Sequence, residues 1–312
     1  MSTIVIALGG NALQDQGSSP TAENQLAVVK KTATNIAGLA RNNRLLIVHG
    51  NGPQVGRLVL QNEFASAITP AMPFDVCAAM SQGLIGYHLQ QGMNEALANL
   101  GIPSSAVTLL TQVLVDENDK AFMHPSKPIG PFYSSEEAQC IMKEKGYVLK
   151  EDAGRGFRRV VPSPEPIKII ELDAIKLLLE NGFIPICVGG GGIPVIKDNR
   201  DHLSGIAAVI DKDLAAERLA EDIDADTLLI LTAVEQVCLN YQKPDQLNLS
   251  QVCAAEMERY IERGHFAPGS MLPKMQAALR FANSAPSRRA IITSLEMAIP
   301  ALDGKAGTII TA

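Results

Sequence analysis

The stretch TIVIALGGN, residues 3–11, decides the fold of this chain. Its first six residues form a β-branched and apolar run that is typical of a strand buried on both faces of a sheet. Two glycines and an asparagine follow directly, and such residues favour a tight turn. Similar runs predict further strands at residues 44–49, 183–188, 227–232 and 290–293.

Helical patterns occupy the intervals between these runs, most clearly at residues 25–40, 78–100, 167–181 and 272–282. Strands that alternate with helices predict a mainly parallel sheet covered by helices on both faces, so we expect an α/β protein. Ligands of such folds bind beyond the carboxyl ends of the strands. The glycine turns of this sequence fall at those ends.

One segment, residues 116–164, departs from this alternation after a strand-like run at 108–115. It is rich in proline, glycine and charge, as in HPSKPIGPFY, residues 124–133. Excursions of this length inside a compact domain are usually functional or disordered, and the prolines and aromatic residues here favour order. We expect a small protruding subdomain or a lid.

Composition excludes several functional classes. The chain of 312 residues has a net charge of −6 and no basic tract, which argues against nucleic acid as a partner. The first apolar run is too short for a signal peptide, and no stretch approaches membrane-spanning length. The five cysteines are scattered, odd in number and lack a Cys-x-x-Cys pair, so we expect reduced thiols and a cytoplasmic protein.

The stretch AAVIDKDLA, residues 207–215, carries the strongest chemical signal. Its apolar run predicts a strand and the residues from Leu214 onward predict a helix, which puts Lys212 at the junction. Free N–H groups and the helix dipole favour an anion there. The neighbouring Asp213 could orient lysines by charge pairing, which we favour. Alternatively, Asp211, Asp213 and Glu217 could include a Mg²⁺ contact.

Three glycine-rich turns favour the same kind of ligand. Gly9-Gly10-Asn11 and Gly50-Asn51-Gly52 follow predicted strands, and glycine permits close backbone approach while asparagine supplies an amide donor. Gly189–Gly192 follows a third strand, without the spacing of a Walker or Rossmann motif. We expect it to form a loop that lies flat against phosphates. The alternative is that these segments are tight structural turns.

Two further lysines are candidates for binding an anion. Lys274 falls in the first turn of a predicted helix, beside Pro273, where a cation is disfavoured by the helix dipole. Lys127 lies within Pro-Ser-Lys-Pro of the excursion. Either lysine could instead be a solvated surface residue. The five histidines show no metal-ligand spacing, so neither a zinc site nor a catalytic triad is predicted.

Eight segments, in this order along nearly the whole chain, together resemble the carbamate kinase branch of the amino acid kinase family. They are ALGGNA (7–12), HGNGPQVG (49–56), SQGLIGY (81–87), KPIGPFY (127–133), EDAGRGFRRVVPSP (151–164), GGGGIPV (189–195), AVIDKDLA (208–215) and GHFAPGSMLPK (264–274). The glycine turns suggest only the wider family, whereas KPIGPFY and DAGRGFRRVV indicate the carbamate kinase branch.

This resemblance implies a single domain over residues 1–312, an open three-layer αβα sandwich with a small protruding subdomain at 116–164. Residues 1–165 would form the substrate-side half and residues 166–312 the nucleotide-side half. It also implies a homodimer and a reversible reaction in which carbamoyl phosphate and ADP give ATP and carbamate, with Mg²⁺ as cofactor. Such a phosphoryl transfer requires positioning and charge neutralisation more than a covalent catalyst.

The resemblance also implies roles for individual residues. Lys212 and Lys274 match the lysines that hold the transferred phosphoryl group, Asp213 matches the acid that positions them, and Lys127 matches the lysine of the subdomain. The substrate-side turns are matched by Gly9, Gly10, Asn11, Gly50 and Asn51. The nucleotide would be seated near Thr232, Tyr241 and Met271. No metal ligand is assigned.

One departure from the family pattern lies near the expected nucleotide, because Ala233 and Glu235 stand where relatives often carry Gly and Asp. A larger residue in that turn could alter nucleotide affinity. Two alternatives stay open: a related amino acid kinase that acts on another small carboxylate, and a non-catalytic sensor or partner protein. Retention of all three lysines and Asp213 speaks against the second. The sequence does not determine the physiological direction, the pathway or the regulation.

Overall fold

The computed structural model describes residues 1–15, 17, 19–152 and 154–312. Its central element is an eight-stranded sheet with the order β15-β17-β16-β12-β1-β2-β9-β3. All neighbouring pairs are parallel except β16 with β17. The strands are β1 (Ser2–Leu8), β2 (Asn43–His49), β3 (Ala106–Thr108), β9 (Ile184–Ile186), β12 (Thr227–Thr232), β15 (Gln251–Cys253), β16 (Arg289–Ser294) and β17 (Thr308–Thr311). The mainly parallel sheet predicted from the sequence is confirmed.

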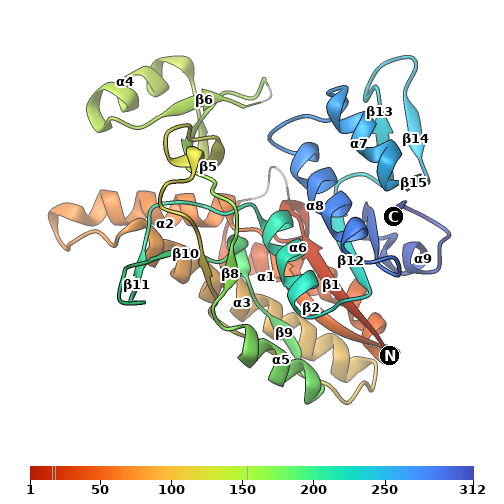
Figure 1. Cartoon of the computed structure of the whole chain (residues 1–312). Helices are drawn as coiled ribbons and strands as arrows, with labels where there is room; N and C mark the ends of the chain where they lie inside the picture. The colour runs from red at the N-terminus through yellow and green to blue at the C-terminus, as the bar shows by residue number, and fades with distance from the viewer. Residues whose placement is uncertain (16, 18, 153) are drawn as a thin grey trace.

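Alternation along the central strands explains why both faces of this sheet are covered. In β1, Ile4 and Ile6 pack into one buried cluster, whereas Val5 and Ala7 pack into another on the opposite face. The first cluster includes side chains of α1 (Ala22–Ala37), α3 (Phe74–Asn99) and α9 (Ala298–Leu302). The second includes side chains of α5 (Leu172–Glu180), α6 (Lys212–Asp222), α7 (Ala254–Glu262) and α8 (Met271–Ser284). The result is a three-layer αβα sandwich (Figure 1).

Smaller sheets surround this core. One has the order β11-β10-β4-β8, and β13 pairs with β14 in a separate hairpin. These strands are β4 (Gln112–Leu114), β8 (Lys168–Ile169), β10 (Ile193–Lys197), β11 (Leu203–Gly205), β13 (Val237–Leu239) and β14 (Leu247–Leu249). Short 3₁₀ turns lie at Gly10–Ala12, Gly38–Arg41, Ala65–Ala67, Lys120–Phe122 and Gly189–Gly191.

Three element predictions need correction. The apolar run at 207–210 is not a strand: Ala208, Val209 and Ile210 are buried as irregular backbone, and the N–H of Val209 donates to the carbonyl of Pro162 at 2.9 Å. Burial alone therefore explains the apolar character of this run. The run at 108–115 is divided between β3 and β4. The helix predicted at 167–181 begins only at Leu172, because β8 first pairs with β4.

Part of the predicted excursion forms a separate unit that projects from the main body (Figure 1). It contains an antiparallel sheet with the order β5-β7-β6, made of β5 (Lys127–Tyr133), β6 (Leu149–Glu151) and β7 (Phe157–Val161), together with α4 (Ser135–Lys145). The side chain of Ser134 and that of Glu137 cap α4 reciprocally, which fixes where this helix begins. Ala153 of the DAGRGF motif lies outside the described residues.

The projecting unit is fixed to α2 (Gly52–Phe64) by two kinds of contact. Glu63 of α2 accepts hydrogen bonds from Lys145 at 2.6 Å and from the hydroxyl of Tyr147. Nearer the sheet, Gly56 of α2 approaches Gly130 of β5 so closely that a methyl group added at Gly56 would lie 2.1 Å from the Gly130 Cα.

In the described part of the chain no helix is both long and apolar enough to span a membrane.

Candidate active site

A buried carboxylate, Asp213, binds two lysines at the carboxyl edge of the central sheet. Asp213 is the second residue of α6 and is 2% exposed. Lys274 Nζ donates to its Oδ2 at 2.9 Å, and Lys212 Nζ donates to its Oδ1. Lys212 begins α6 and Lys274 lies in the first turn of α8, and these two helices pack together. The structure therefore brings together three residues that the sequence singled out.

Charge dominates over burial at this carboxylate. Burial acts to raise the pKa of Asp213, but the two ammonium groups outweigh it and hold that pKa well below its usual range. Burial lowers the pKa of Lys212 despite the attraction of Asp213. For Lys274 burial acts in the same direction, yet the Asp213 charge prevails and raises the pKa. Two cations on one carboxylate leave a net positive centre that suits an anionic group.

Asp211, to which the sequence assigned no role, connects α6 to the projecting unit. Its Oδ1 accepts the backbone N–H of Asp213 at 2.8 Å, which caps the start of α6. Its Oδ2 accepts Lys127 Nζ at 2.5 Å, and Lys127 is the first residue of β5. The capping role could be predicted from the sequence, because Asp211 lies just before a predicted helix. The ion pair could not, because 84 positions separate the two residues.

The first two glycine turns lie where the sequence predicted them, at the ends of β1 and β2. A methyl group added at Gly50 would lie 3.4 Å from the Lys212 side chain, so the turn permits the lysine to lie across it. Asn51 is buried and its Nδ2 donates to Ser81 Oγ at 2.8 Å. The amide donor expected to face a ligand therefore binds α3 instead.

The four consecutive glycines are enclosed by protein. Methyl groups added at Gly189, Gly190 and Gly191 would lie 2.4 Å or less from His49, Asn51 and Ile210 respectively. Gly192 meets Val113 in the same way at 2.2 Å. Burial lowers the pKa of His49 to about 4, so this histidine is neutral at pH 7. Close packing accounts for these glycines without a ligand, and of the four only Gly190 lines the cavity beside the lysines.

Three adjoining cavities meet at Lys274. The smallest, of about 180 Å³, is lined by Gly50, Asn51, Lys127, Lys212 and Asp213. A second, of about 370 Å³, has a lining that includes Gly9, Gly10, Asn11, Lys31, Lys212 and Glu296. The largest, of about 660 Å³, is lined by Thr232, Tyr241, Met271 and Lys274.

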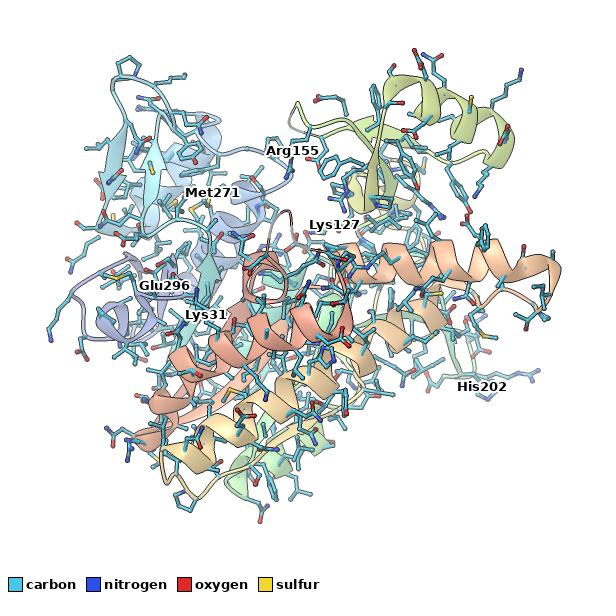
Figure 2. The ribbon with its side chains drawn as sticks, turned by 180° about the vertical axis from the view of Figure 1, so that it is seen from behind. Lys31, Lys127, Arg155, His202, Met271 and Glu296 are labelled. Carbon is cyan, nitrogen blue, oxygen red and sulfur yellow. The ribbon has the colours of Figure 1, made fainter. Side chains whose placement is uncertain are left out.

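These cavities bring every predicted substrate-side and nucleotide-side residue into one continuous region. Figure 2 shows Lys127 beneath the projecting unit and Met271 on the opposite side, toward the C-terminal part of the chain. Lys212 and Lys274 line both the smallest and the second cavity, so they lie between the two sides. Among the described residues, no group of three His, Cys, Asp or Glu side chains could hold a metal ion.

An αβα fold with a cationic centre between a small and a large cavity is typical of one class of protein, a phosphotransferase that moves a phosphoryl group between a small substrate and a larger one. Comparisons with known proteins narrow this class. The model of the amino acid kinase family matches residues 2–294. Carbamate kinase of Clostridium perfringens is 53% identical over 309 residues, 98% of each chain. Carbamate kinase 1 of Enterococcus faecium is 51% identical over 310 residues, 99% of this chain and 98% of its own.

Solved structures agree with the sequence relatives. Carbamate kinase from Giardia lamblia bound to AMP-PNP is 44% identical and has a TM-score of 0.91, covering 99% of this chain and 98% of that one. The chain belongs to the amino acid kinase family. Within that family it belongs to the carbamate kinase branch.

Proposed function

We propose that this enzyme catalyses reversible phosphoryl transfer between carbamoyl phosphate and ADP, which gives ATP and carbamate. The observation that carries the proposal is the pair of lysines on one buried carboxylate, Asp213, between a small and a large cavity. Carbamate kinases at about 50% identity over the whole chain support the same reaction. Carbamate then breaks down to ammonia and carbon dioxide.

The small cavity favours carbamoyl phosphate over a larger carboxylate substrate. Its volume of about 180 Å³ lies below the range usual for pockets that hold drug-sized ligands. The turns at Gly9–Asn11 and Gly50–Asn51 and the side chain of Lys127 would bind this substrate. An N-acetylated amino acid would need room for a longer side chain, and no comparison supports that alternative.

The adjoining large cavity, of about 660 Å³, suits a nucleotide. Thr232, Tyr241 and Met271 would contact the nucleotide, and Lys274 would reach its terminal phosphate. Ala233 lines the same cavity, so the departure from the family pattern falls where it would affect nucleotide affinity. Residues 1–165 supply half of the lining of the small cavity, whereas the lining of the large cavity comes from 166–312 alone. We therefore retain these halves as substrate-side and nucleotide-side.

The chemistry follows from positioning and charge. In the transition state negative charge spreads over the phosphoryl oxygens, and Lys212 and Lys274 are placed to neutralise it from two sides. Asp213 holds both ammonium groups in place, so little reorganisation is needed as the charge moves. Carbamate is already an anion and needs no base to activate it. The buried, neutral His49 beside the turns is therefore not required as a base.

Mg²⁺ fits this site as a partner of the nucleotide. Asp213 is occupied by two lysines, and the described residues offer no ready set of three ligands. Mg²⁺ commonly takes few protein ligands and keeps water and phosphate oxygens, so nucleotide phosphates would supply most of its ligands. When bound, it would neutralise phosphate charge that the lysines do not reach.

A coupled assay of ATP formation tests the function directly. The purified chain is given ADP, Mg²⁺ and either carbamoyl phosphate or acetyl phosphate, and ATP is followed over time. We expect rapid ATP formation from carbamoyl phosphate and much slower formation from acetyl phosphate. Absence of ATP from carbamoyl phosphate, in folded protein that binds ADP, would contradict the proposal and favour a non-catalytic role.

We also propose a homodimer that forms through α3. Met80, Leu84 and Tyr87 follow one another on one side of this helix and are 42%, 37% and 60% exposed. A second copy of the chain, related by a twofold axis, would cover the same residues on both partners.

From the scattered, odd number of cysteines we place the enzyme in the cytoplasm.

A further inference from the structure

Gln54 carries a buried polar atom that the protein leaves unpaired beside the lysines. Among the described residues, two buried side-chain atoms lack a hydrogen-bond partner, Oε1 of Gln54 and Oγ1 of Thr293. Of these two, only Gln54 lines a cavity of the active site, the small one shared with Lys127 and Lys212. Gln54 is 3% exposed. An unpaired buried acceptor is unfavourable, and because Gln54 lines that cavity, a hydrogen-bond donor bound there would relieve the cost.

The surrounding backbone points to the same partner. Gln54 lies in the first turn of α2, a helix of 13 residues that begins after Asn51 with no side-chain cap. The N–H groups of a first helical turn have no partner inside the helix and favour an anion. The amide of Gln54 and the start of α2 therefore line the same small cavity, and together they suit an anionic group that also bears hydrogen-bond donors.

The charged side chains around this cavity are already paired with one another. Lys127 is paired with Asp211, and both oxygens of Asp213 accept hydrogen bonds from lysines. Lysine only donates hydrogen bonds, so it cannot accept one from an amino group. Gln54 offers an acceptor and two donors on one planar group.

We propose that Gln54 is a specificity-determining residue that recognises the carbamoyl end of the substrate. A carbamoyl group has the same pattern as the glutamine amide, one carbonyl acceptor and one NH₂ donor in a plane. The two groups pair when Gln54 Oε1 accepts the substrate N–H and Gln54 Nε2 donates to the substrate carbonyl. Acetyl phosphate has a methyl group in place of NH₂ and forms only the second of these bonds. This inference rests on the proposed function.

Two substitutions of similar size distinguish the contribution of the Gln54 amide donor from that of its acceptor. Gln54→Met removes both, and we expect it to reduce the ratio of kcat/KM for carbamoyl phosphate to kcat/KM for acetyl phosphate by about ten- to hundredfold. Gln54→Glu keeps an acceptor but loses the donor and adds a negative charge. We expect it to raise the KM for both acyl phosphates while most of the preference for carbamoyl phosphate is retained. The KM for ADP should change little in either variant.

The matched control is Gln61→Met, which makes the same change on the exposed side of the same helix. It should leave the substrate ratio unchanged, and thermal unfolding should show that all variants are folded. If wild-type protein makes ATP from carbamoyl phosphate and Gln54→Met keeps the full ratio, the assignment to Gln54 is wrong while the proposed function stands. If Gln54→Met does not fold, Gln54→Ala, which also lacks the acceptor, takes its place, and a full ratio in that variant overturns the assignment. A wild-type chain that makes no ATP from carbamoyl phosphate overturns both.

Discussion

Asp213 accepts hydrogen bonds from both Lys212 and Lys274, so loss of either lysine leaves the buried carboxylate with one partner. Such a variant should fold. The transition state, however, would lose one of two positive charges placed against the phosphoryl oxygens. Removal of a single such electrostatic contact typically costs a factor of about 10²–10³ in kcat.

We therefore expect Lys212→Ala and Lys274→Ala each to lower kcat for ATP formation from carbamoyl phosphate by about 10²-fold or more. Circular dichroism and thermal unfolding should show a folded protein in both cases. Lys143→Ala, an exposed lysine on α4, is the control and should be fully active. Turnover near the wild-type rate in either active-site variant would show that the lysine does not contact the phosphoryl group.

At the scale of elements, the approach of α2 to β5 determines where Lys127 lies. Gly56 and Gly130 are in direct contact, and a methyl group at Gly56 would overlap the Gly130 backbone. Backbone atoms cannot move aside as a flexible side chain can. A side chain at position 56 therefore has to push β5, and Lys127 with it, away from the sheet.

Gly56→Ala should raise the KM for carbamoyl phosphate severalfold and lower stability by about 1–3 kcal/mol through overpacking. Initial rates at varied carbamoyl phosphate and urea unfolding measure the two effects. Gly38→Ala is a suitable control, because its added methyl group would meet only the Ile299 side chain, at an ordinary 4.0 Å. An unchanged KM in Gly56→Ala would mean that Lys127 reaches its position independently of α2.

The packing of α6 against α8 also buries a carboxyl group, Glu217. Burial raises its pKa to about 8, with a contribution from Glu221, while Arg218 and Arg280 of α8 oppose the shift. The folded state therefore holds a proton that the unfolded state releases near its ordinary pKa of 4.5. The stability contributed by this protonated group is complete below about pH 4.5 and is lost as the pH rises through about 8.

Glu217→Gln should remove this pH dependence, because the amide is neutral throughout. Between pH 5 and pH 9 the wild type should lose more than about 1 kcal/mol of unfolding free energy relative to the variant. Denaturant unfolding at several pH values measures the difference. The exposed Glu258→Gln on α7 is the control. Parallel pH profiles for wild type and Glu217→Gln would show that Glu217 is ionised in the fold.

At the scale of the whole molecule, the apolar row on α3 belongs to no internal core. Leu84→Arg would place a charge in the centre of the proposed dimer interface and should convert dimer to monomer. Sedimentation velocity measures the change, and Leu177→Arg, at another exposed apolar site on α5, is the control. If Leu84→Arg sediments as the wild type does, α3 is not the interface.

The fold was largely predictable because its strands are apolar runs that end in glycine turns. Parallel pairing puts those turns on one edge, so the candidate site was also predictable to the level of its lysines. The strand prediction failed at residues 207–210, because a buried irregular segment has the same apolar sequence as a buried strand. The same ambiguity affected Gly189–Gly192, since close packing and phosphate contact both require residues without side chains.

The sequence by itself determined the α/β class and the edge that bears the candidate site, and it singled out Lys212, Lys274 and Asp213, which the structure brings together. It did so because hydrophobic periodicity and turn residues act locally. Only the tertiary structure decided that Asp211 joins α6 to Lys127 and that Gln54 lies unpaired in the small cavity. Such contacts join segments far apart in the chain, and their energies depend on burial, which no local pattern specifies.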